Sequence, residues 1–420
     1  MGHILVTKAG SCIIIIFTIM SIMTGVSAQQ TDIHDFQSEL VNYVVWSPDG
    51  SKIGVASTDG FLSIWQTADL RHTVTFDAFT EASAPSGPQR YDFAWSPDGA
   101  RIVTGGHDTF LRVWNVADGK LLATLMQENA FVTDVDWSDN GAFIGGTQAG
   151  DFGVEIWDAT TYQRVSAYPN SSVSIDFSPD SRQFVMGVSG IIGIYDTRSG
   201  ELLYGLPAPA ENQTFYLFHL DELLGTVIWT PDHRYIIGFR SNNSIEVWDI
   251  ESKQMKHSFE NPGLPFFSPV TMDFDTVSNN TFSLVGLDGI LQTRDLESGK
   301  LIEQRQVIEA GQPSAFSPYG GRLAVIDAQV KRANGELPLQ IIVPIASVER
   351  VQGIAQRCVA DANNLTSAVT DVFNRTAIES LTETTLPAFV EAVEALPSDA
   401  IPPACRADLI AVAEAVIDEP

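Results

Sequence analysis

A short phrase recurs along most of the chain, and it restricts the possible folds more than any other feature. It reads Trp-Ser-Pro-Asp-Gly at residues 46–50 and again at 95–99, with weaker copies opening at Trp137, Phe177, Trp229, Phe274 and Phe316. The seven opening aromatic residues are separated by 49, 42, 40, 52, 45 and 42 residues. A steady period of this length indicates a repeat protein in which each repeat is one supersecondary unit. Such a pattern predicts the architecture far better than it predicts a partner.

A second aromatic residue follows the first by 18 to 20 residues in five units, at Trp65, Trp114, Trp157, Tyr195 and Trp248. In the last three of these units an aspartate comes directly after it. Over residues 40–352 the chain therefore resembles the WD40-repeat family. That resemblance implies a β-propeller. A propeller of the secreted, periplasmic-binding type, which also uses Ser-Pro-Asp-Gly turns, is an alternative with the same architecture.

The residues between the landmarks support the same fold. In residues 93–125, four short runs of alternating apolar character are separated by Pro-Asp-Gly, His-Asp and Asp-Gly turns. Such turns suit tight connections between antiparallel strands. A four-stranded sheet repeated radially is a propeller blade. We therefore predict an all-β fold, a seven-bladed WD40-like β-propeller over residues 40–356, with a small C-terminal α-helical appendage.

The repeat landmarks are interpreted as structural. They comprise Trp46, Trp65, Trp95, Trp114, Trp137, Trp157, Trp229 and Trp248, together with the turn aspartates Asp59, Asp108, Asp151 and Asp288. The Gly-His pair usual in the family is missing from every unit, so the family's His–Ser–Asp–Trp hydrogen-bond network is incomplete. We therefore expect the four aspartates to act as turn formers.

The first thirty residues predict export. Lys8 is followed by an apolar stretch over residues 13–23 and by the small residues Val26-Ser27-Ala28, which together resemble a cleavable secretory signal over residues 1–28. The stretch is short for a membrane span, although an uncleaved anchor is the alternative. Residues 29–39 would form a lead-in to the propeller. We expect an extracytoplasmic, bacterial protein with no membrane span after cleavage.

The last part of the chain changes character at about residue 357. The apolar period lengthens to that of a helix, with Leu409, Val412 and Val416 on one face after Pro402-Pro403. Cys358 and Cys405 are the two cysteines outside the signal, so we expect them to form one disulfide. Residues 357–420 would then be a disulfide-clipped helical region docked beside the seventh blade. WD40-like propellers often borrow an N-terminal strand to complete the last blade, and residues 31–36 are the candidate for that role here. Because this segment is short and polar, we expect instead that residues 348–354 form the outer strand of blade seven, so that the ring closes with its own strand.

Charge and motif content restrict the function. The net charge is −28, and loss of Lys8 with the signal takes it to −29, which disfavours nucleic acid and anionic lipid as partners. The seven histidines show no metal-ligand spacing, and no nucleophile elbow or phosphate-binding glycine loop is present. We predict no cofactor and no enzymatic activity. The alternative is a hydrolase or lyase with its site at the channel mouth, because a propeller can gather carboxylates from several blades there.

Three insertions suggest where a partner binds. They span residues 80–90, 207–225 and 329–338, and in WD40-like propellers all three connections open on the same face. Long loops on a rigid scaffold commonly carry function. We predict a protein or peptide partner on this face, with Phe215, Tyr216 and Phe218 as apolar anchors and Arg90, Lys331 and Arg332 as polar contacts. Packing of the Phe215 cluster as a short helix over the ring is the alternative for those aromatic residues, and solvated loop charge is the alternative for Lys331 and Arg332. A carbohydrate- or envelope-binding module is a further possibility for the whole protein.

Overall fold

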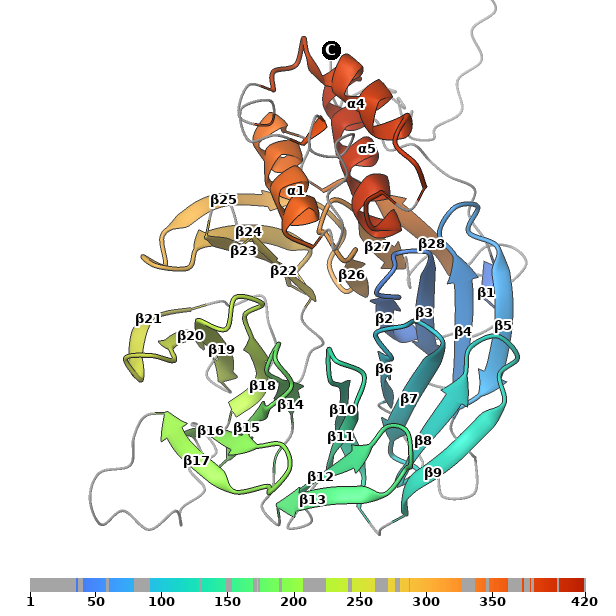
Figure 1. The fold of residues 1–420 in the computed structure, drawn as a ribbon, viewed down its shortest axis with the longest axis vertical. Helices are drawn as coiled ribbons and strands as arrows, with labels where there is room; N and C mark the ends of the chain where they lie inside the picture. Colours follow the sequence, from blue (N-terminus) through green and yellow to red (C-terminus); the bar gives the residue numbers. More distant parts are fainter. Residues whose placement is uncertain are drawn as a thin grey trace, which may run out of the picture.

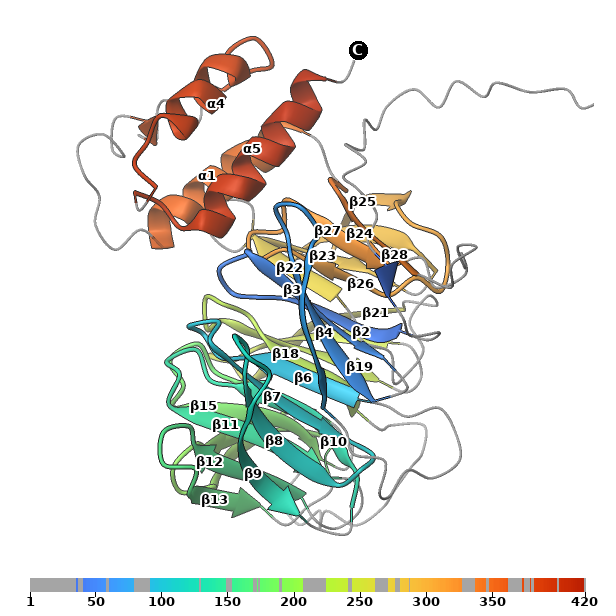
Figure 2. The same ribbon diagram turned by 90° about the vertical axis from the view of Figure 1, so that its right-hand side faces the viewer.

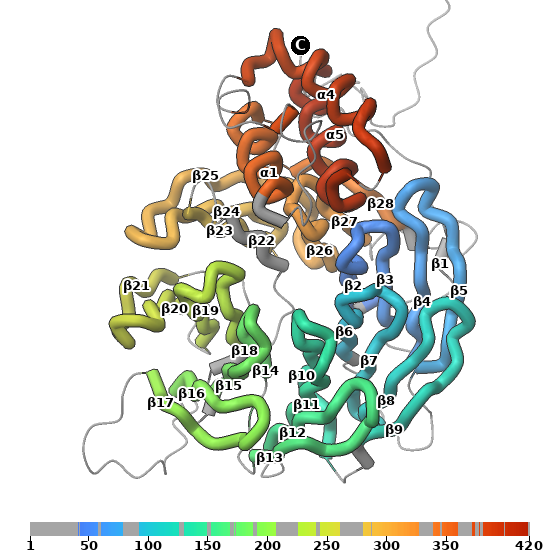
Figure 3. Tube along the Cα trace, in the orientation of Figure 1, coloured from blue at the N-terminus to red at the C-terminus, as the bar shows by residue number. Residues whose placement is uncertain are grey.

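The computed structural model shows seven four-stranded antiparallel sheets arranged around a central axis, which confirms the predicted seven-bladed propeller (Figure 1). The structure describes residues 35–36 and 41–418, with gaps at 58–59, 79–90, 128–129, 149–152, 169–171, 173, 189–190, 207–223, 241–243, 261–270, 276–279, 287, 327–336, 345–346, 362–371, 374–377, 379–380 and 399. The chain turns once around the ring, with colours running from blue to orange in Figure 3.

Each blade runs from an inner strand to an outer strand. Blade one comprises β2 Val41–Trp46, β3 Lys52–Ser57, β4 Phe61–Gln66 and β5 His72–Asp77. Blade two comprises β6 Tyr91–Trp95, β7 Arg101–Gly106, β8 Phe110–Asn115 and β9 Leu121–Gln127. Blade three comprises β10 Val132–Trp137, β11 Phe143–Gln148, β12 Gly153–Asp158 and β13 Arg164–Tyr168. Blade four comprises β14 Ile175–Phe177, β15 Gln183–Val188, β16 Ile191–Asp196 and β17 Leu202–Leu206.

The remaining blades follow the same order until the last strand. Blade five comprises β18 Leu224–Trp229, β19 Tyr235–Arg240, β20 Ser244–Asp249 and β21 Gln254–Glu260. Blade six comprises β22 Thr271–Asp275, β23 Thr281–Val285, β24 Ile290–Asp295 and β25 Leu301–Gln306. Blade seven comprises β26 Ser314–Phe316, β27 Leu323–Ile326, β28 Leu337–Ile342 and, from the start of the chain, β1 Asp35–Phe36.

Ring closure differs from the expectation. The outer strand of blade seven is β1, which pairs antiparallel with β28 through Asp35 with Pro338 and Phe36 with Leu337. Residues 348–354 belong instead to helix α1, Val348–Asp361. Their apolar residues fit a helix because Val351, Ile354, Ala355 and Cys358 recur three or four residues apart, and all four are buried. The prediction of a strand there was wrong, and the helical region begins at Val348 rather than at residue 357.

The hydrophobic core is divided into wedges between neighbouring blades. Each wedge joins the inner strands of one blade to those of the next, and four wedges contain both tryptophans of a repeat. The wedge between blades seven and one, for example, contains Trp46 and Trp65 together with Ala315 and Leu339. Stability of the ring therefore comes from contacts between consecutive blades, as in other repeat proteins.

A separate helical unit completes the molecule. It contains α1, α4 Leu386–Glu394 and α5 Pro403–Ile417, and α5 begins at the predicted Pro402-Pro403 pair. Cys358 on α1 and Cys405 on α5 form a disulfide. The unit has its own apolar core, which also takes in Tyr319 of blade seven. In the edge-on view the helices lie to one side of the ring (Figure 2).

Candidate interaction site

The antiparallel order of the strands gives the ring two different faces. The connections from the first to the second strand and from the third to the fourth strand lie on one face, which we call the turn face. The connections from the second to the third strand and from each blade to the next lie on the opposite face, which we call the loop face. The three insertions in the sequence join strands at the loop face. The helical unit contacts the turn face, because α5 lies against Gly50 and Gly321 in first-to-second turns.

Two exposed aromatic side chains mark the loop face. Phe61 opens the third strand of blade one and is 41% exposed, and Phe131 immediately precedes the inner strand of blade three and is 39% exposed. The Phe131 ring lies against the imidazole of His107, with ring centroids 4.6 Å apart and planes 30° apart. His107 belongs to the turn between β7 and β8 of blade two. The Phe131–His107 pair therefore spans two blades, with the phenyl ring exposed and the imidazole half-buried against it.

A buried ion pair supports this turn from beneath. Arg112 Nη1 lies 2.5 Å from Asp108 Oδ2, and the two side chains are 5% and 3% exposed. The guanidinium also donates to the carbonyl of Ala78 at 3.3 Å and stacks on the Phe110 ring at 4.3 Å. Because Asp108 follows His107 directly, this network restrains the backbone that carries the imidazole. Sequence reasoning assigned Asp108 to the turn but gave no sign of its ionic partner four residues later.

The partner-binding residues predicted from the sequence, Arg90, Phe215, Tyr216, Phe218, Lys331 and Arg332, lie outside the described residues. Their role stays a prediction. Phe61 and Phe131 were missed. Phe61 follows a glycine and Phe131 stands one residue ahead of a strand, so their only signal was an aromatic residue at the loop-face end of a strand.

Carboxylates on the inner strands join consecutive blades. Asp92, Asp134 and Asp136 each accept a hydrogen bond from a backbone amide of the next blade, donated by Val135, Ile175 and Phe177 at 2.8 to 3.0 Å. Asp176 accepts one from the amide of Trp229 at 2.5 Å. The second oxygen of Asp136 accepts from the following backbone amide, that of Trp137, at 2.7 Å. A catalytic site at the channel mouth would require carboxylates from several blades, and these four are such a set. Their hydrogen bonds, however, already join blades two to five.

The environment of this carboxylate cluster favours protonated forms. Burial raises the pKa of Asp136 to about 7, the charge of Asp134 adds to the rise, and the amides of Phe177 and Trp137 oppose it. Burial likewise raises the pKa of Asp134 and Asp176 well above the ordinary value, each reinforced by a neighbouring carboxylate. The phenol of Tyr43 has a pKa raised by burial and by Asp92. Two neighbouring carboxylates of this cluster therefore share one proton more readily than they both ionise.

Comparison with known families agrees with the geometry. The family model "WD domain, G-beta repeat" matches residues 28–66, 86–115 and 119–158. Each match ends where the third strand of a blade ends, at Gln66, Asn115 and Asp158. The chain is a seven-bladed propeller that carries WD40 repeats. The matched unit is offset from the blade: the match at 119–158 begins with outer strand β9 of blade two, and the first match includes β1, the outer strand of blade seven.

A distant relative shares the repeats of this WD40 propeller. The "Guanine nucleotide-binding protein subunit beta" of Saccharomyces cerevisiae is 21% identical over 282 residues, which cover 61% of this chain. The aligned region spans 63% of the length of that relative. The likeness extends across several repeats and leaves more than a third of each protein unmatched.

The repeat residues of the WD40 propeller lie in its core and turns. Seven of the eight tryptophans are at most 7% exposed, and Trp157 is partly buried. Several indoles bond across blades or strands, as when Trp114 Nε1 donates to Thr104 Oγ1 at 2.9 Å. Asp108 and Asp288 each accept from the amide two residues on, at 3.3 and 3.0 Å. Asp59 and Asp151 lie outside the described residues.

Among the residues that the structure describes, no group of three or more histidine, cysteine or acidic side chains is placed to hold a metal ion. Across the same residues, none of the helices combines the length and apolar character needed to cross a bilayer.

Proposed function

We propose that this WD40 propeller is an exported scaffold that binds a protein or peptide partner through its loop face. The observation that carries the proposal is the Phe131–His107 pair, in which the exposed phenyl ring of Phe131 packs against the half-buried imidazole of the neighbouring blade. The buried Asp108–Arg112 ion pair restrains the turn that carries this imidazole. Aromatic side chains on a rigid support contribute strongly to protein interfaces because little conformational entropy is lost on binding.

The helical unit covers part of one face of the ring, so the two faces differ in how much surface a partner can reach. The helical unit occupies part of the turn face, over blades seven and one, and leaves the loop face to the blade connections. The predicted anchors Phe215, Tyr216 and Phe218 and the basic residues Arg90, Lys331 and Arg332 belong to connections whose flanking strands end at the loop face. With a net charge of −28, the chain favours a partner segment of basic character.

Export is supported by two features of the chain. Residues 1–28 have the order of a secretory signal, and the Cys358–Cys405 disulfide is of a kind that persists in oxidising compartments. We expect the mature protein to begin at Gln29 outside the cytoplasm. Sequencing the N-terminus of the protein recovered from envelope and medium fractions would check this, and an intact Met1 in the cytosolic fraction would contradict it.

Binding is tested by affinity capture from the envelope and medium with the full mature chain as bait. We expect a retained partner to be lost on Phe131→Ser, and on the triple replacement of Phe215, Tyr216 and Phe218 by Ser. Leu122→Ser is a matched control, because Leu122 is 43% exposed at the start of outer strand β9, at its turn-face end. A partner retained equally by the two loop-face variants and lost on Leu122→Ser would move the site to the turn face.

We do not assign the inner-strand carboxylates to catalysis. Each of Asp92, Asp134, Asp136 and Asp176 accepts a hydrogen bond from the next blade, so that role already accounts for their position. An enzyme at the channel mouth would require at least one of them to leave its amide. Loss of a hydrolytic or lyase activity in Asp92→Asn, with unchanged stability, would establish the enzymatic alternative.

A further inference from the structure

The turns between first and second strands share one hydrogen-bond pattern in blades one to five. In blade one, Asp49 Oδ1 accepts from Ser47 Oγ at 2.6 Å and from the amide of Ser51 at 3.1 Å. The amide of Lys52 then donates to Ser47 Oγ at 2.9 Å, which closes the turn. The same acceptor role is taken by Asp98, Asn140, Asp180 and Asp232 in the next four blades.

The corresponding turn of blade seven, Ser317–Arg322, has the same backbone but lacks this acceptor. The amide of Ser317 donates to the carbonyl of Arg322 at 2.9 Å, and the amide of Gly320 donates to the carbonyl of Ser317 at 2.7 Å, as the equivalent groups do in blade one. Gly320 and Gly50 both have a positive φ, 70° and 65°. Tyr319, however, stands where Asp49 stands in blade one. Its side chain is 8% exposed and packs into the core of the helical unit.

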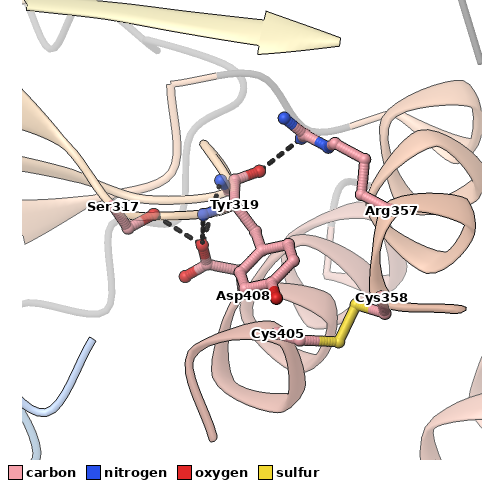
Figure 4. Close-up of a disulfide and its surroundings, with 7 residues drawn as sticks. Ser317, Tyr319, Arg357, Cys358, Cys405 and Asp408 are labelled. Carbon is pink, nitrogen blue, oxygen red and sulfur yellow. Dashed lines mark hydrogen bonds between the residues drawn. A yellow bond between two sulfur atoms is a disulfide. The ribbon is translucent and has the colours of Figure 1, made fainter. Parts of the chain in front are cut away.

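Asp408 of helix α5 takes the place of the missing acceptor. Asp408 Oδ2 accepts from Ser317 Oγ at 2.6 Å and from the amides of Tyr319 and Gly321 at 3.2 and 3.4 Å (Figure 4). Asp408 is 0% exposed, and its other oxygen accepts from Arg322 Nε at 2.6 Å. The bonds that Asp49 accepts from Ser47 Oγ and from the amide of Ser51 thus each have a counterpart in blade seven, made by a carboxylate from the helical unit.

The close approach of α5 depends on a glycine in the turn. A Cβ atom placed on Gly321 would lie 2.8 Å from Cβ of Asp408 and 3.0 Å from its carbonyl oxygen. Real Cβ atoms essentially never show the first distance, and the second is tighter than most Cβ contacts. Blade seven therefore differs in three ways from the turns of blades one to five, at Tyr319, at Gly321 and in the carboxylate supplied by α5, and each difference suits the docking of α5.

Helix α1 contacts the same turn through two arginine side chains. Arg350 Nη2 donates to the carbonyl of Gly320 at 2.6 Å, and the guanidinium of Arg357 donates to the carbonyl of Tyr319. Arg357 directly precedes Cys358, and Asp408 lies three residues after Cys405 on the same helix. The disulfide therefore joins the two helices at the positions from which both reach the turn.

We propose that the helical unit is a latch that closes the ring at blade seven. Arg322 links the latch to the seam between the last and first blades, because it bonds Asp408 and also stacks on the Trp46 ring at 4.7 Å. When the helical unit separates from the ring, the turn of blade seven loses the hydrogen bonds of Asp408. Arg322 then loses its anchor beside Trp46 at the seam. The disulfide keeps the latch engaged, so its reduction to two thiols by a dithiol, which is itself oxidised to a disulfide, frees the turn.

The test is hydrogen–deuterium exchange of the full mature chain, read at the amides of Ser317–Arg322 and at the equivalent turns of other blades. We expect Asp408→Ala to accelerate exchange of the blade-seven turn at least tenfold and to leave the turn of blade two unchanged. Asp98→Ala is the matched control, with acceleration confined to blade two. Unchanged protection of the blade-seven turn in Asp408→Ala would overturn the proposal, since the unit would then merely dock on a turn that is already formed.

A compensating variant separates the latch from general destabilisation. Tyr319→Asp places a carboxylate at the position of Asp49, so the double variant Tyr319→Asp/Asp408→Ala is expected to recover turn protection although α5 has lost its anchor. Dithiothreitol is expected to accelerate exchange of the turn in the wild type and not in this double variant. If α1 and α5 lose protection on reduction while the wild-type turn keeps it, the ring closes without the latch.

Discussion

Trp46 Nε1 donates a 2.9 Å hydrogen bond to the carbonyl of Ala315, 269 residues later in the chain. Trp46 ends the inner strand of blade one and Ala315 lies in the inner strand of blade seven, so this bond crosses the seam of the ring. At the outer edge, β1 pairs with β28 across the same junction. The ring is thus closed at its inner wall, at its outer strand and, through Arg322, at the helical unit.

Loss of the seam bond should destabilise the first and last blades together. Trp46→Phe keeps an aromatic ring but removes the donor, and we expect a loss of roughly 1–2 kcal/mol in the free energy of unfolding because a buried carbonyl is left without its partner. Urea denaturation measures the loss. Trp114→Phe is the control, since its indole bonds within one blade. Hydrogen exchange should accelerate in blades one and seven for Trp46→Phe. For Trp114→Phe it should accelerate in blades one and two, which share the Trp114 wedge, and not in blade seven.

The carboxylate cluster of the inner strands should make the stability of the fold depend on pH. Asp136 has a pKa of about 7 in the folded protein, above the ordinary value of 3.8. Its protonation stabilises the fold fully below pH 3.8, and this contribution is lost as the pH rises through about 7. Between these values the free energy of unfolding should fall by up to about 1.4 kcal/mol per pH unit from this group.

The variant Asp136→Asn isolates that contribution from the other acids of the chain. We expect the difference in unfolding free energy between wild type and variant to change steadily from pH 4.5 to pH 7 and to be constant above pH 8. Denaturant titrations at each pH give this difference. A difference that is independent of pH would show that the carboxylate ionises normally in the folded ring.

The ion pair beneath the aromatic surface should be intolerant of single replacements. Arg112→Met leaves the Asp108 carboxylate buried without its cation, and we expect a loss of roughly 3–5 kcal/mol. The double variant Asp108→Asn/Arg112→Met removes the charge as well, so its loss should be smaller than that of Arg112→Met. Thermal unfolding of the three proteins compares them, and a double variant that is less stable than Arg112→Met would contradict the pairing.

The disulfide should stabilise the helical unit more than the ring. It closes a loop of 47 residues, and in the chain-entropy model this contributes up to roughly 4 kcal/mol. We expect Cys358→Ala/Cys405→Ala to melt in two steps in calorimetry, with the helices first. The wild type in dithiothreitol should also melt in two steps, with the helices first. A single transition shifted as a whole would show that unit and ring unfold cooperatively.

The repeated pattern of the sequence was sufficient to predict the propeller. Its tryptophans and Pro-Asp-Gly turns act within one blade or between consecutive blades, so their spacing along the chain reports directly on their arrangement. The helix of residues 348–361 was missed because blade seven needed a fourth strand, and residues 348–354 were the apolar segment that followed its third strand. Closure by an N-terminal strand was the alternative that the sequence left open, and it was set aside because residues 31–36 are short and polar, with little strand pattern.

The sequence by itself determined the number of blades, the position of most strands and the pairing of two cysteines, because these depend on local periodicity and on counting. Only the tertiary structure decided how the ring closes, which carboxylates join the blades and which residue completes the turn of blade seven. Asp408 is 91 residues from Ser317, on an element with a different period, and nothing in the spacing connects them. Contacts of this kind arise when separate units pack, since burial and hydrogen bonding then select partners by their position in space and not by their distance along the chain.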